Sequence, residues 1–287
     1  MEQTDYATYR SQQRFFDSKD GPLAFIDHGS GPVILLLHGV PTSGWLYRHM
    51  ISDLTSQGFR VIVPDMLGYG SSASPDLYEV YHEQEHASRI LALMSFLNIP
   101  QWHHVMHDAG GLWTWPLFAL SPKSILSLTA LNCIAFEAGF KPPMRFKRGF
   151  LAKAVMWTYH NGITTSMMLK GLFKSGLNKN SLTKQDIEGY KKPLLEGKTK
   201  GMYYFFTQTC NKLPLISKFT DKVDVPAQII WGKNDSFLKL QPQRDEFTAF
   251  LSVGDDSVHI LDAKHFIQEE KPKEIVTLIT KFLKELV

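Results

Sequence analysis

The segment Val33–Leu37 consists of five consecutive apolar residues, and the polar residue His38 follows it directly. A strand of this kind has no polar face, so other parts of the chain must cover it on both sides. Strands covered on both faces are typical of parallel sheets, because the helices that connect parallel strands pack above and below them. This segment therefore predicts an α/β protein built around a mostly parallel sheet.

Similar apolar segments recur along the chain, and helical patterns separate them. The predicted strands are residues 23–27, 33–37, 61–64, 103–107, 125–131, 227–231 and 257–261. Amphipathic helical patterns cover 46–56, 85–97 and 272–286, and an apolar segment runs from Asp108 to Leu120. Strands that alternate with helices, joined by right-handed crossovers, give a doubly wound, mostly parallel sheet.

The alternation of strands and helices stops between residues 136 and 215. This region has aromatic-rich and methionine-rich helical stretches, interrupted by Pro and Gly, and no clear strand. We interpret it as a helical lid, or cap, inserted into a core domain formed by residues 1–135 and 216–287. A chain of 287 residues is compatible with one such core.

The composition gives no sign of a membrane anchor or a secretory signal. The chain has no apolar run long enough to span a bilayer, and its first 18 residues are polar and include acids. We therefore expect a cytoplasmic protein. The formal net charge is only +3, and we interpret the basic stretch Lys141–Lys153 as a solvated face. A nucleic-acid-binding or lipid-binding surface is not expected, and the sequence does not indicate an oligomeric state.

No metal or organic cofactor is expected. Cys133 and Cys210 are the only cysteines, and they lack the spacing of zinc ligands, so we predict two buried free thiols. His103 and His104 lie in a predicted buried strand without a neighbouring carboxylate or thiolate set. We expect these two histidines to be structural.

Asp108 lies at the end of the predicted strand 103–107, where an apolar helix begins. In open parallel sheets, ligands and catalytic groups gather just beyond the carboxyl ends of the strands. The sequence Met106-His107-Asp108-Ala109-Gly110-Gly111 resembles the nucleophile elbow G-x-S-x-G with aspartate in place of serine. Met106 departs from that pattern, which usually has a small residue there. The alternative is that Asp108 only caps the following helix.

Asp235 and His265 each follow a later strand. Asp235 comes after the strand that ends at Trp231, and His265 comes after the strand that ends near Leu261. Each has an ordinary interpretation, a turn-forming aspartate or a capping histidine. However, the order nucleophile, acid, histidine is that of the α/β-hydrolase triad. We therefore predict Asp108 as nucleophile, His265 as general base and Asp235 as the acid that orients the base.

Two more segments resemble motifs of the same fold. His38-Gly39-Val40-Pro41 resembles the oxyanion loop, which implies an oxyanion hole formed by the backbone N–H groups of Val40 and Ala109. The segment that begins at Asp65 matches the D-x-x-G-x-G-x-S turn, to which we assign a structural role. Over nearly its whole length the chain resembles the aspartate-nucleophile branch of the α/β-hydrolase superfamily, which includes epoxide hydrolases and haloalkane dehalogenases.

The resemblance implies a two-step hydrolysis. The Asp108 carboxylate would displace a leaving group at a saturated carbon, and water activated by His265 would hydrolyse the resulting alkyl ester. Epoxide hydrolase is our leading hypothesis, and it requires a lid tyrosine that donates to the ring oxygen. Tyr204 is the first candidate and Tyr159 the second, with Tyr203 beside them. The alternative is that these aromatic residues only form the core of the lid.

Haloalkane dehalogenase is the alternative reaction. Thr42, Ser43 and Trp157 look dehalogenase-like, and Trp157 could contact a halide. Against this, Ala109 stands where dehalogenases carry tryptophan, and Val40 where many carry asparagine. A third possibility is a non-catalytic binding protein of the same fold, which the complete triad disfavours.

The expected partners are a small hydrophobic substrate and water. Bulky apolar residues fall in or near the lid and the elbow, and methionine side chains adapt to varied ligand shapes. We therefore predict an apolar pocket lined by Trp113, Phe136, Met156, Trp157, Met167 and Met168.

Overall fold

The strands of the computed structural model form one sheet. The structure describes residues 5–142, 144–179, 182–213, 218–219 and 223–286. Its eight strands are β1 Arg14–Ser18, β2 Gly21–His28, β3 Val33–Leu37, β4 Arg60–Pro64, β5 Trp102–Asp108, β6 Ile125–Cys133, β7 Ala227–Gly232 and β8 Val258–Leu261.

The order of the strands confirms the predicted fold class. Across the sheet the order is β1-β2-β4-β3-β5-β6-β7-β8. Strands β1 and β2 are antiparallel to their neighbours, and all pairs from β4 to β8 are parallel. The chain thus has the mostly parallel sheet of an α/β-hydrolase fold, with two antiparallel strands at one edge.

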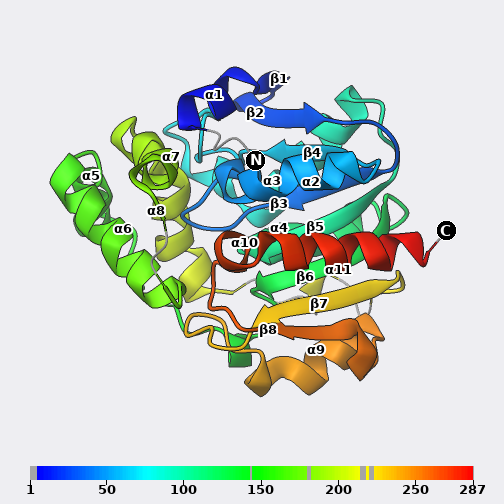
Figure 1. Ribbon diagram of the computed structural model, residues 1–287. Helices are drawn as coiled ribbons and strands as arrows, with labels where there is room; N and C mark the ends of the chain where they lie inside the picture. Colours follow the sequence, from blue (N-terminus) through cyan, green and yellow to red (C-terminus); the bar gives the residue numbers. More distant parts are fainter. Residues whose placement is uncertain (1–4, 143, 180–181, 214–217, 220–222, 287) are drawn as a thin grey trace.

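Helices cover both faces of this sheet. The helices of the chain, those of the lid included, are α1 Tyr6–Ser11, α2 Arg48–Ser56, α3 Glu83–Phe96, α4 Gly110–Leu120, α5 Phe150–Thr158, α6 Gly162–Gly176, α7 Lys184–Leu195, α8 Lys200–Thr207, α9 Arg244–Leu251, α10 Ile267–Glu270 and α11 Pro272–Lys284. Short 3-10 helices are η1 Gly44–Tyr47, η2 Tyr78–Tyr81, η3 Glu137–Gly139, η4 Thr209–Asn211, η6 Gln241–Gln243 and η7 Asp255–Ser257. Helix α2 packs beside α11, and α3 packs beside α4 (Figure 1). Within the described residues, no helix is both long and apolar enough to cross a bilayer.

The central strands lie in the core, as their composition requires. All seven residues of β5 are buried, and so are four of the five residues of β3. Burial of such strands supplies most of the favourable free energy of folding, at roughly 25 cal/mol per Å² of apolar surface. The packed core therefore holds the carboxyl ends of β5, β6 and β7 in fixed positions.

Helices α5–α8 lie between β6 and β7 in the chain and at one end of the sheet in space (Figure 1). Helices α7 and α8 face the core, because α7 contacts α1 and α8 contacts η2, while α5 packs on α8 and α6 on α7. This arrangement agrees with a lid over residues 136–215. Its exact limits stay a prediction, and residue 215 lies outside the described residues.

The sequence patterns missed α1, β1 and α9. Helix α1 is short, and its position depends on distant contacts: Tyr6 and Tyr9 each meet the ring of Trp45 edge-on at 5.2 Å. Strand β1 is an exposed edge strand with only weak apolar alternation. Local periodicity carries little information about elements that tertiary contacts stabilise.

Candidate active site

Asp108 is the last residue of β5, in a sharp turn that leads into α4. Its φ is +51°, a left-handed conformation that is uncommon for residues other than glycine. A Cβ atom at Gly110 would lie 2.8 Å from the carbonyl oxygens of Leu37 and His38, so only glycine fits this close approach. These two features are typical of a nucleophile elbow, in which the turn directs one side chain into the site.

Backbone N–H groups face the Asp108 carboxylate. The N–H of Val40 donates to Asp108 Oδ1 at 2.7 Å. Burial raises the pKa of Asp108, and His265 and the backbone N–H groups of Ala109 and Val40 oppose that rise. The predicted oxyanion donors are thus beside the carboxylate on which a tetrahedral intermediate would form.

His265 lies between the two carboxylates. Its Nδ1 is 2.9 Å from Asp235 Oδ2, and its Nε2 is 3.7 Å from Asp108 Oδ2. Burial alone would lower the pKa of His265, but the carboxylates of Asp235 and Asp108 raise it overall. The structure therefore brings the three residues together in the geometry of a nucleophile, a base and an orienting acid.

Asn132, near the end of β6, was missed by the sequence analysis. Its side-chain NH₂ donates to Asp235 Oδ2 and to the carbonyl of Lys264, and its Oδ1 accepts from the N–H of Gly232 at 2.9 Å. The backbone N–H groups of Phe237 and Leu238 donate to Asp235 Oδ1. Although burial would raise it, the pKa of Asp235 is lowered by His265 and these donors. The sequence offered one signal for Asn132, since it is a polar residue directly after the predicted apolar strand 125–131.

Asn132→Ala should lower kcat about tenfold, because Asp235 loses one buried hydrogen-bond donor and then orients His265 less firmly. Steady-state kinetics as a function of pH would measure this. A positioning role also requires the pKa of His265 to change in the pH profile. A variant with a lower melting temperature but an unchanged kcat and pH profile would contradict it.

Two buried histidines, His107 and His38, form hydrogen bonds with backbone groups of the site. His107 Nε2 donates to the carbonyl of His265 at 3.0 Å, and the two rings lie 4.7 Å apart. His38 Nε2 accepts from the N–H of Met66, and its Nδ1 donates to the carbonyl of Gly39. Burial holds the pKa of His107 well below its usual value and lowers that of His38 to about 4. Both side chains are therefore uncharged, and each holds a backbone segment of the site in place through hydrogen bonds.

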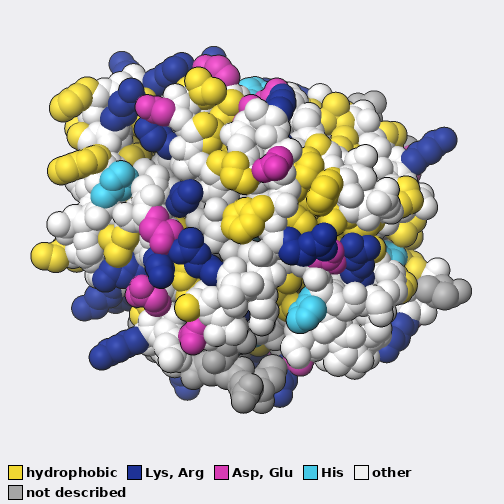
Figure 2. All heavy atoms as spheres, turned by 90° about the horizontal axis from the view of Figure 1, so that it is seen from above, with side chains coloured by type: hydrophobic (Ala, Val, Ile, Leu, Met, Phe, Trp, Pro, Cys, Tyr) yellow, Lys and Arg dark blue, Asp and Glu magenta, His cyan; other side chains and the backbone are white. Residues whose placement is uncertain are grey.

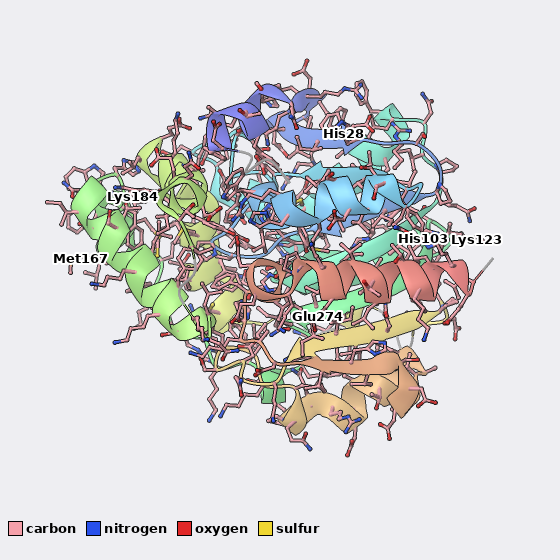
Figure 3. All side chains as sticks on the ribbon, in the orientation of Figure 1. His28, His103, Lys123, Met167, Lys184 and Glu274 are labelled. Carbon is pink, nitrogen blue, oxygen red and sulfur yellow. The ribbon has the colours of Figure 1, made fainter. Side chains whose placement is uncertain are left out.

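His103 and His104 are removed from this site. His103 Nδ1 bonds with Ser127 Oγ at 2.9 Å, and His104 Nε2 bonds with Thr114 Oγ1 at 2.8 Å. Figure 3 shows His103 at the end of the sheet away from the lid. Cys133 and Cys210 are both free and buried, as expected.

The predicted lid residues form no hydrogen bond with Asp108 in the described part of the chain. The ring of Tyr204 packs against Tyr78, 4.8 Å between centroids, and the hydroxyl of Tyr203 accepts from the N–H of Gly149 at 3.2 Å. Tyr159 is buried, whereas Trp157 is 70% exposed. The structure does not group these four residues with the triad.

Tyr69 and Cys210 share the electrostatic surroundings of Asp108 instead. Burial raises the pKa of both side chains, and the charge of Asp108 adds to the rise. The ring of Tyr69 packs against His38 and Trp113, at 5.5 and 5.8 Å. Tyr69 belongs to the turn that we interpreted as structural only, so its place near the site was missed.

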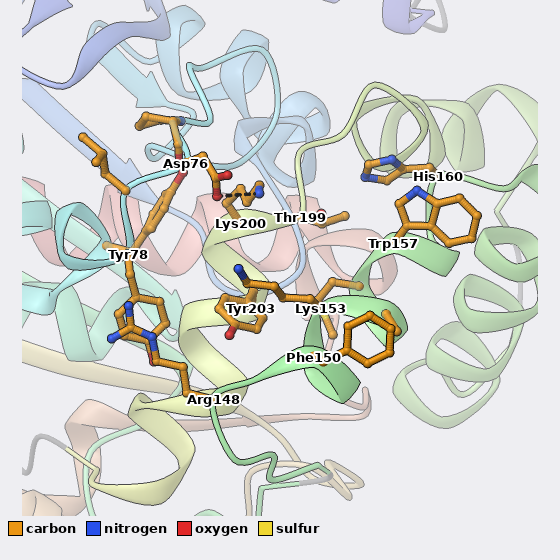
Figure 4. Close-up of a pocket in the computed structure, with 15 residues that line it drawn as sticks. Asp76, Tyr78, Arg148, Phe150, Lys153, Trp157, His160, Thr199, Lys200 and Tyr203 are labelled. Atoms are coloured by element: carbon orange, nitrogen blue, oxygen red, sulfur yellow. Dashed lines mark hydrogen bonds and ion pairs between the residues drawn. The ribbon is translucent and has the colours of Figure 1, made fainter.

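A pocket of about 520 Å³ lies between the lid and the segment 75–81. Figure 4 shows it between α5, α8 and the segment 75–81. Met156 and Trp157 line it as predicted, but Trp113, Phe136, Met167 and Met168 do not. The prediction failed for Phe136 because that ring packs on Phe247, and for Met167 because it points to solvent. The triad does not line this pocket.

No metal site accompanies the triad in the described residues. No group of three or more His, Cys, Asp or Glu side chains there is arranged to hold an ion. The absence of a cofactor stays a prediction.

Comparison with known proteins decides the family. Residues 32–272 match the family described as alpha/beta hydrolase fold. The chain belongs to this family. This result and the sheet topology confirm the predicted class of protein, an α/β-fold hydrolase.

Relatives of this chain include enzymes of two kinds. The chain is 26% identical to bifunctional epoxide hydrolase 2 of Rattus norvegicus over 91% of its own length, and it spans about half (53%) of that relative. It is 25% identical to haloalkane dehalogenase 2 of Mycobacterium bovis, over 96% of both chains. A solved epoxide hydrolase from Vigna radiata has the same fold, with a TM-score of 0.76 and 22% identity over 95% of this chain and 97% of that one.

Proposed function

We propose that this α/β-hydrolase-fold protein hydrolyses a hydrophobic epoxide through a covalent ester on Asp108. The observation that carries the proposal is the placement of Asp108, whose carboxylate accepts from the N–H of Val40 and lies 3.7 Å from His265 Nε2. A carboxylate in the position of a nucleophile suits attack at a saturated carbon, since the product is an ester that water can hydrolyse. Cytoplasmic location stays a prediction.

The first step forms the ester. An oxygen of Asp108 attacks a ring carbon, the carbon–oxygen bond of the ring breaks, and the released oxygen takes a proton from a neighbouring donor. Tyr204, Tyr159 and Tyr203 remain candidates for that donor, and Tyr69 joins them because it shares the surroundings of Asp108. Single Tyr→Phe variants should distinguish them, because only loss of the true donor slows ester formation.

The second step releases the diol. His265, held by Asp235, takes a proton from water, and the hydroxide attacks the carboxyl carbon of Asp108. The N–H groups of Val40 and Ala109 stabilise the oxyanion, and the intermediate collapses with transfer of the proton of His265 to the product oxygen. The second proton of the water returns to the donor that protonated the ring oxygen, which leaves the diol and the free carboxylate. One epoxide and one water are consumed for each diol.

A single turnover in water labelled with the heavy oxygen isotope tests the ester. Because the oxygen added in the first turnover comes from Asp108, the diol should be unlabelled and the peptide that contains Asp108 should gain the label. Labelled diol together with an unlabelled peptide would show direct attack by water on the substrate.

Turnover should rise with pH through a pKa above 6.5, the usual value for histidine. His265 must be neutral to accept a proton from water, and the carboxylates beside it raise its pKa. Asp235→Asn should lower kcat and move the midpoint of the pH profile to lower pH, because the raising charge is lost. A midpoint that stays in place would contradict the assignment of Asp235.

Haloalkane dehalogenase is the second candidate, supported by the relative that aligns over 96% of both chains. Against it, the side chains of Ala109 and Val40 cannot donate to a halide, and Trp157 is largely exposed. A binding protein without turnover is a third possibility, which the intact triad disfavours.

A further inference from the structure

The outer surface of the lid exposes an unusual set of large apolar side chains. Phe150, Leu151 and Trp157 of α5 are 88%, 70% and 70% exposed, and Ile163 and Met167 of α6 are 73% and 69% exposed. They are the five most exposed large apolar side chains of the described residues. We call them the lid patch. Exposed apolar residues grouped in this way mark an interaction surface.

The same region is strongly cationic. Residues 136–215 contain 14 Lys and Arg against 4 Asp and Glu, a formal charge of +10, whereas the whole chain carries only +3. The rest of the protein is therefore acidic, and the positive charge is concentrated on the lid. Figure 2 shows apolar side chains projecting at the lid end of the molecule, on the left, among Lys and Arg.

Exposed lysines lie next to the apolar residues of the lid patch along both α5 and α6. Lys153 follows Phe150 by one turn of α5, and Lys170 follows Met167 by one turn of α6. Lys153, Lys170 and Lys174 are exposed, and within the described part of the chain no acidic side chain lies within ion-pair distance of them. Their charges are thus available to an external partner. In Figure 3, Met167 lies at the outer edge of the lid.

The lid patch is continuous with the mouth of the pocket between the lid and the segment 75–81. Phe150, Lys153 and Trp157 line that pocket, together with Leu77, which is itself 62% exposed. Figure 4 shows Phe150 and Trp157 on its α5 side. A partner on the lid patch would therefore cover the entrance to the pocket.

We propose that the outer surface of α5 and α6 docks on the surface of an anionic lipid bilayer. Apolar side chains on a helix bury themselves at the boundary between headgroups and acyl chains, and lysines around them are attracted to anionic lipids. A second copy that docked through its own lid patch would present the same positive charge and repel. Nucleic acid would leave five exposed apolar side chains without a partner.

Docking would bring the mouth of this pocket to the bilayer surface. If the proposed epoxide hydrolysis holds, an apolar epoxide dissolved in the bilayer would meet the protein at Phe150 and Trp157, at a pocket that the triad itself does not line. The docking itself does not depend on that reaction. The docking experiment measures lipid binding without enzymatic turnover. A failure of the docking proposal can therefore be distinguished from a failure of the proposed hydrolysis.

The experiment measures binding of the full chain to vesicles by flotation, with phosphatidylcholine alone or with about 30% phosphatidylserine. Trp157 is the reporter, because the other five tryptophans are buried. Its emission should shift to shorter wavelength, and lipids brominated on the acyl chain should quench it, only with the anionic vesicles. Salt at about 0.5 M should weaken the binding.

Matched variants decide whether the lid is responsible. Lys153→Glu, Lys170→Glu and Lys174→Glu together should lower the partition coefficient at least about 100-fold. The control reverses three exposed lysines of α11, Lys273, Lys281 and Lys284, and should have a much smaller effect.

Substitutions of apolar residues complete the test. Ile163→Ser with Met167→Ser should abolish insertion, whereas Phe15→Ser with Ile260→Ser, both exposed on strands, should not. Three results would overturn the proposal: no binding to anionic vesicles, equal loss in the α11 control, or a shift of Trp157 emission that follows protein concentration without lipid. The last would identify a second copy as the partner.

Discussion

Asp108→Asn should lower kcat at least about 10⁴-fold, since the amide cannot attack a saturated carbon as a carboxylate does. Asparagine has nearly the same shape and tolerates the left-handed φ of +51° at this position. The fold and the affinity for a substrate analogue should therefore be retained. Initial rates and circular dichroism on the same preparation would measure both.

The control for Asp108→Asn is Asp76→Asn. Asp76 lines the pocket and pairs with Lys200 at 2.6 Å, but it has no contact with the triad in the described structure. Its loss should leave kcat within about twofold, because exposed ion pairs contribute little. If the Asp108→Asn variant retained most of its turnover, Asp108 would not be the nucleophile.

Arg48→Leu should lower the free energy of unfolding by about 3–5 kcal/mol. Arg48 is buried on α2, and its guanidinium forms two bonds with Glu269, of 2.6 and 2.8 Å, and one of 2.8 Å with Asp186 of the lid. Removing the cation leaves two poorly solvated carboxylates without the guanidinium that neutralises them. This cluster joins α2, α10 and α7, so the lid should also detach more readily from the core.

Urea denaturation would measure the effect of Arg48→Leu, and limited proteolysis would report on the lid. Lys271→Ala is the matched control, because Lys271 pairs with Glu274 at 2.7 Å on the surface. That change should cost less than about 1 kcal/mol. An equal decrease in the free energy of unfolding for the two variants would contradict a special contribution of the buried Arg48 cluster to stability.

The sheet and the proximity of Asp108, Asp235 and His265 could be predicted because their signals are local. Strands β3 and β5 are continuous apolar segments, and a strand of that composition must be covered on both faces. Asp108 ends a strand, and Asp235 and His265 each follow one, so their order along the chain carried the information. The small residues after Asp108 indicated a tight turn, and Gly110 has no room for a side chain.

The lid could not be predicted at the level of side chains. Its helices were expected, but which tyrosine faces Asp108 depends on how α8 packs on η2, an arrangement of residues more than 100 positions apart. Tyr204 accordingly packs against Tyr78. The contacts of Asn132 with Asp235 and Gly232 are similarly distant in sequence, and only the sheet brings them together.

The interpretation of Lys141–Lys153 as a solvated face shows the same limit. A charge run has no defined neighbours in the sequence, so exposure to water was the simplest expectation. The structure places Phe150, Trp157 and Met167 on the surface of the same lid. It is this combination of charge and exposed apolar area that supports our proposal of a lipid surface.

The most direct test of the central claim is intact-protein mass spectrometry of His265→Gln after separate incubation with styrene oxide and with a bromoalkane. Without the base, the ester on Asp108 should persist. We expect a mass increase equal to the whole epoxide, located on the peptide that contains Asp108, and none with the bromoalkane. An increase equal to the alkyl group without bromine would contradict the epoxide assignment in favour of a dehalogenase. No adduct with either compound would contradict a nucleophilic Asp108 for both substrate classes.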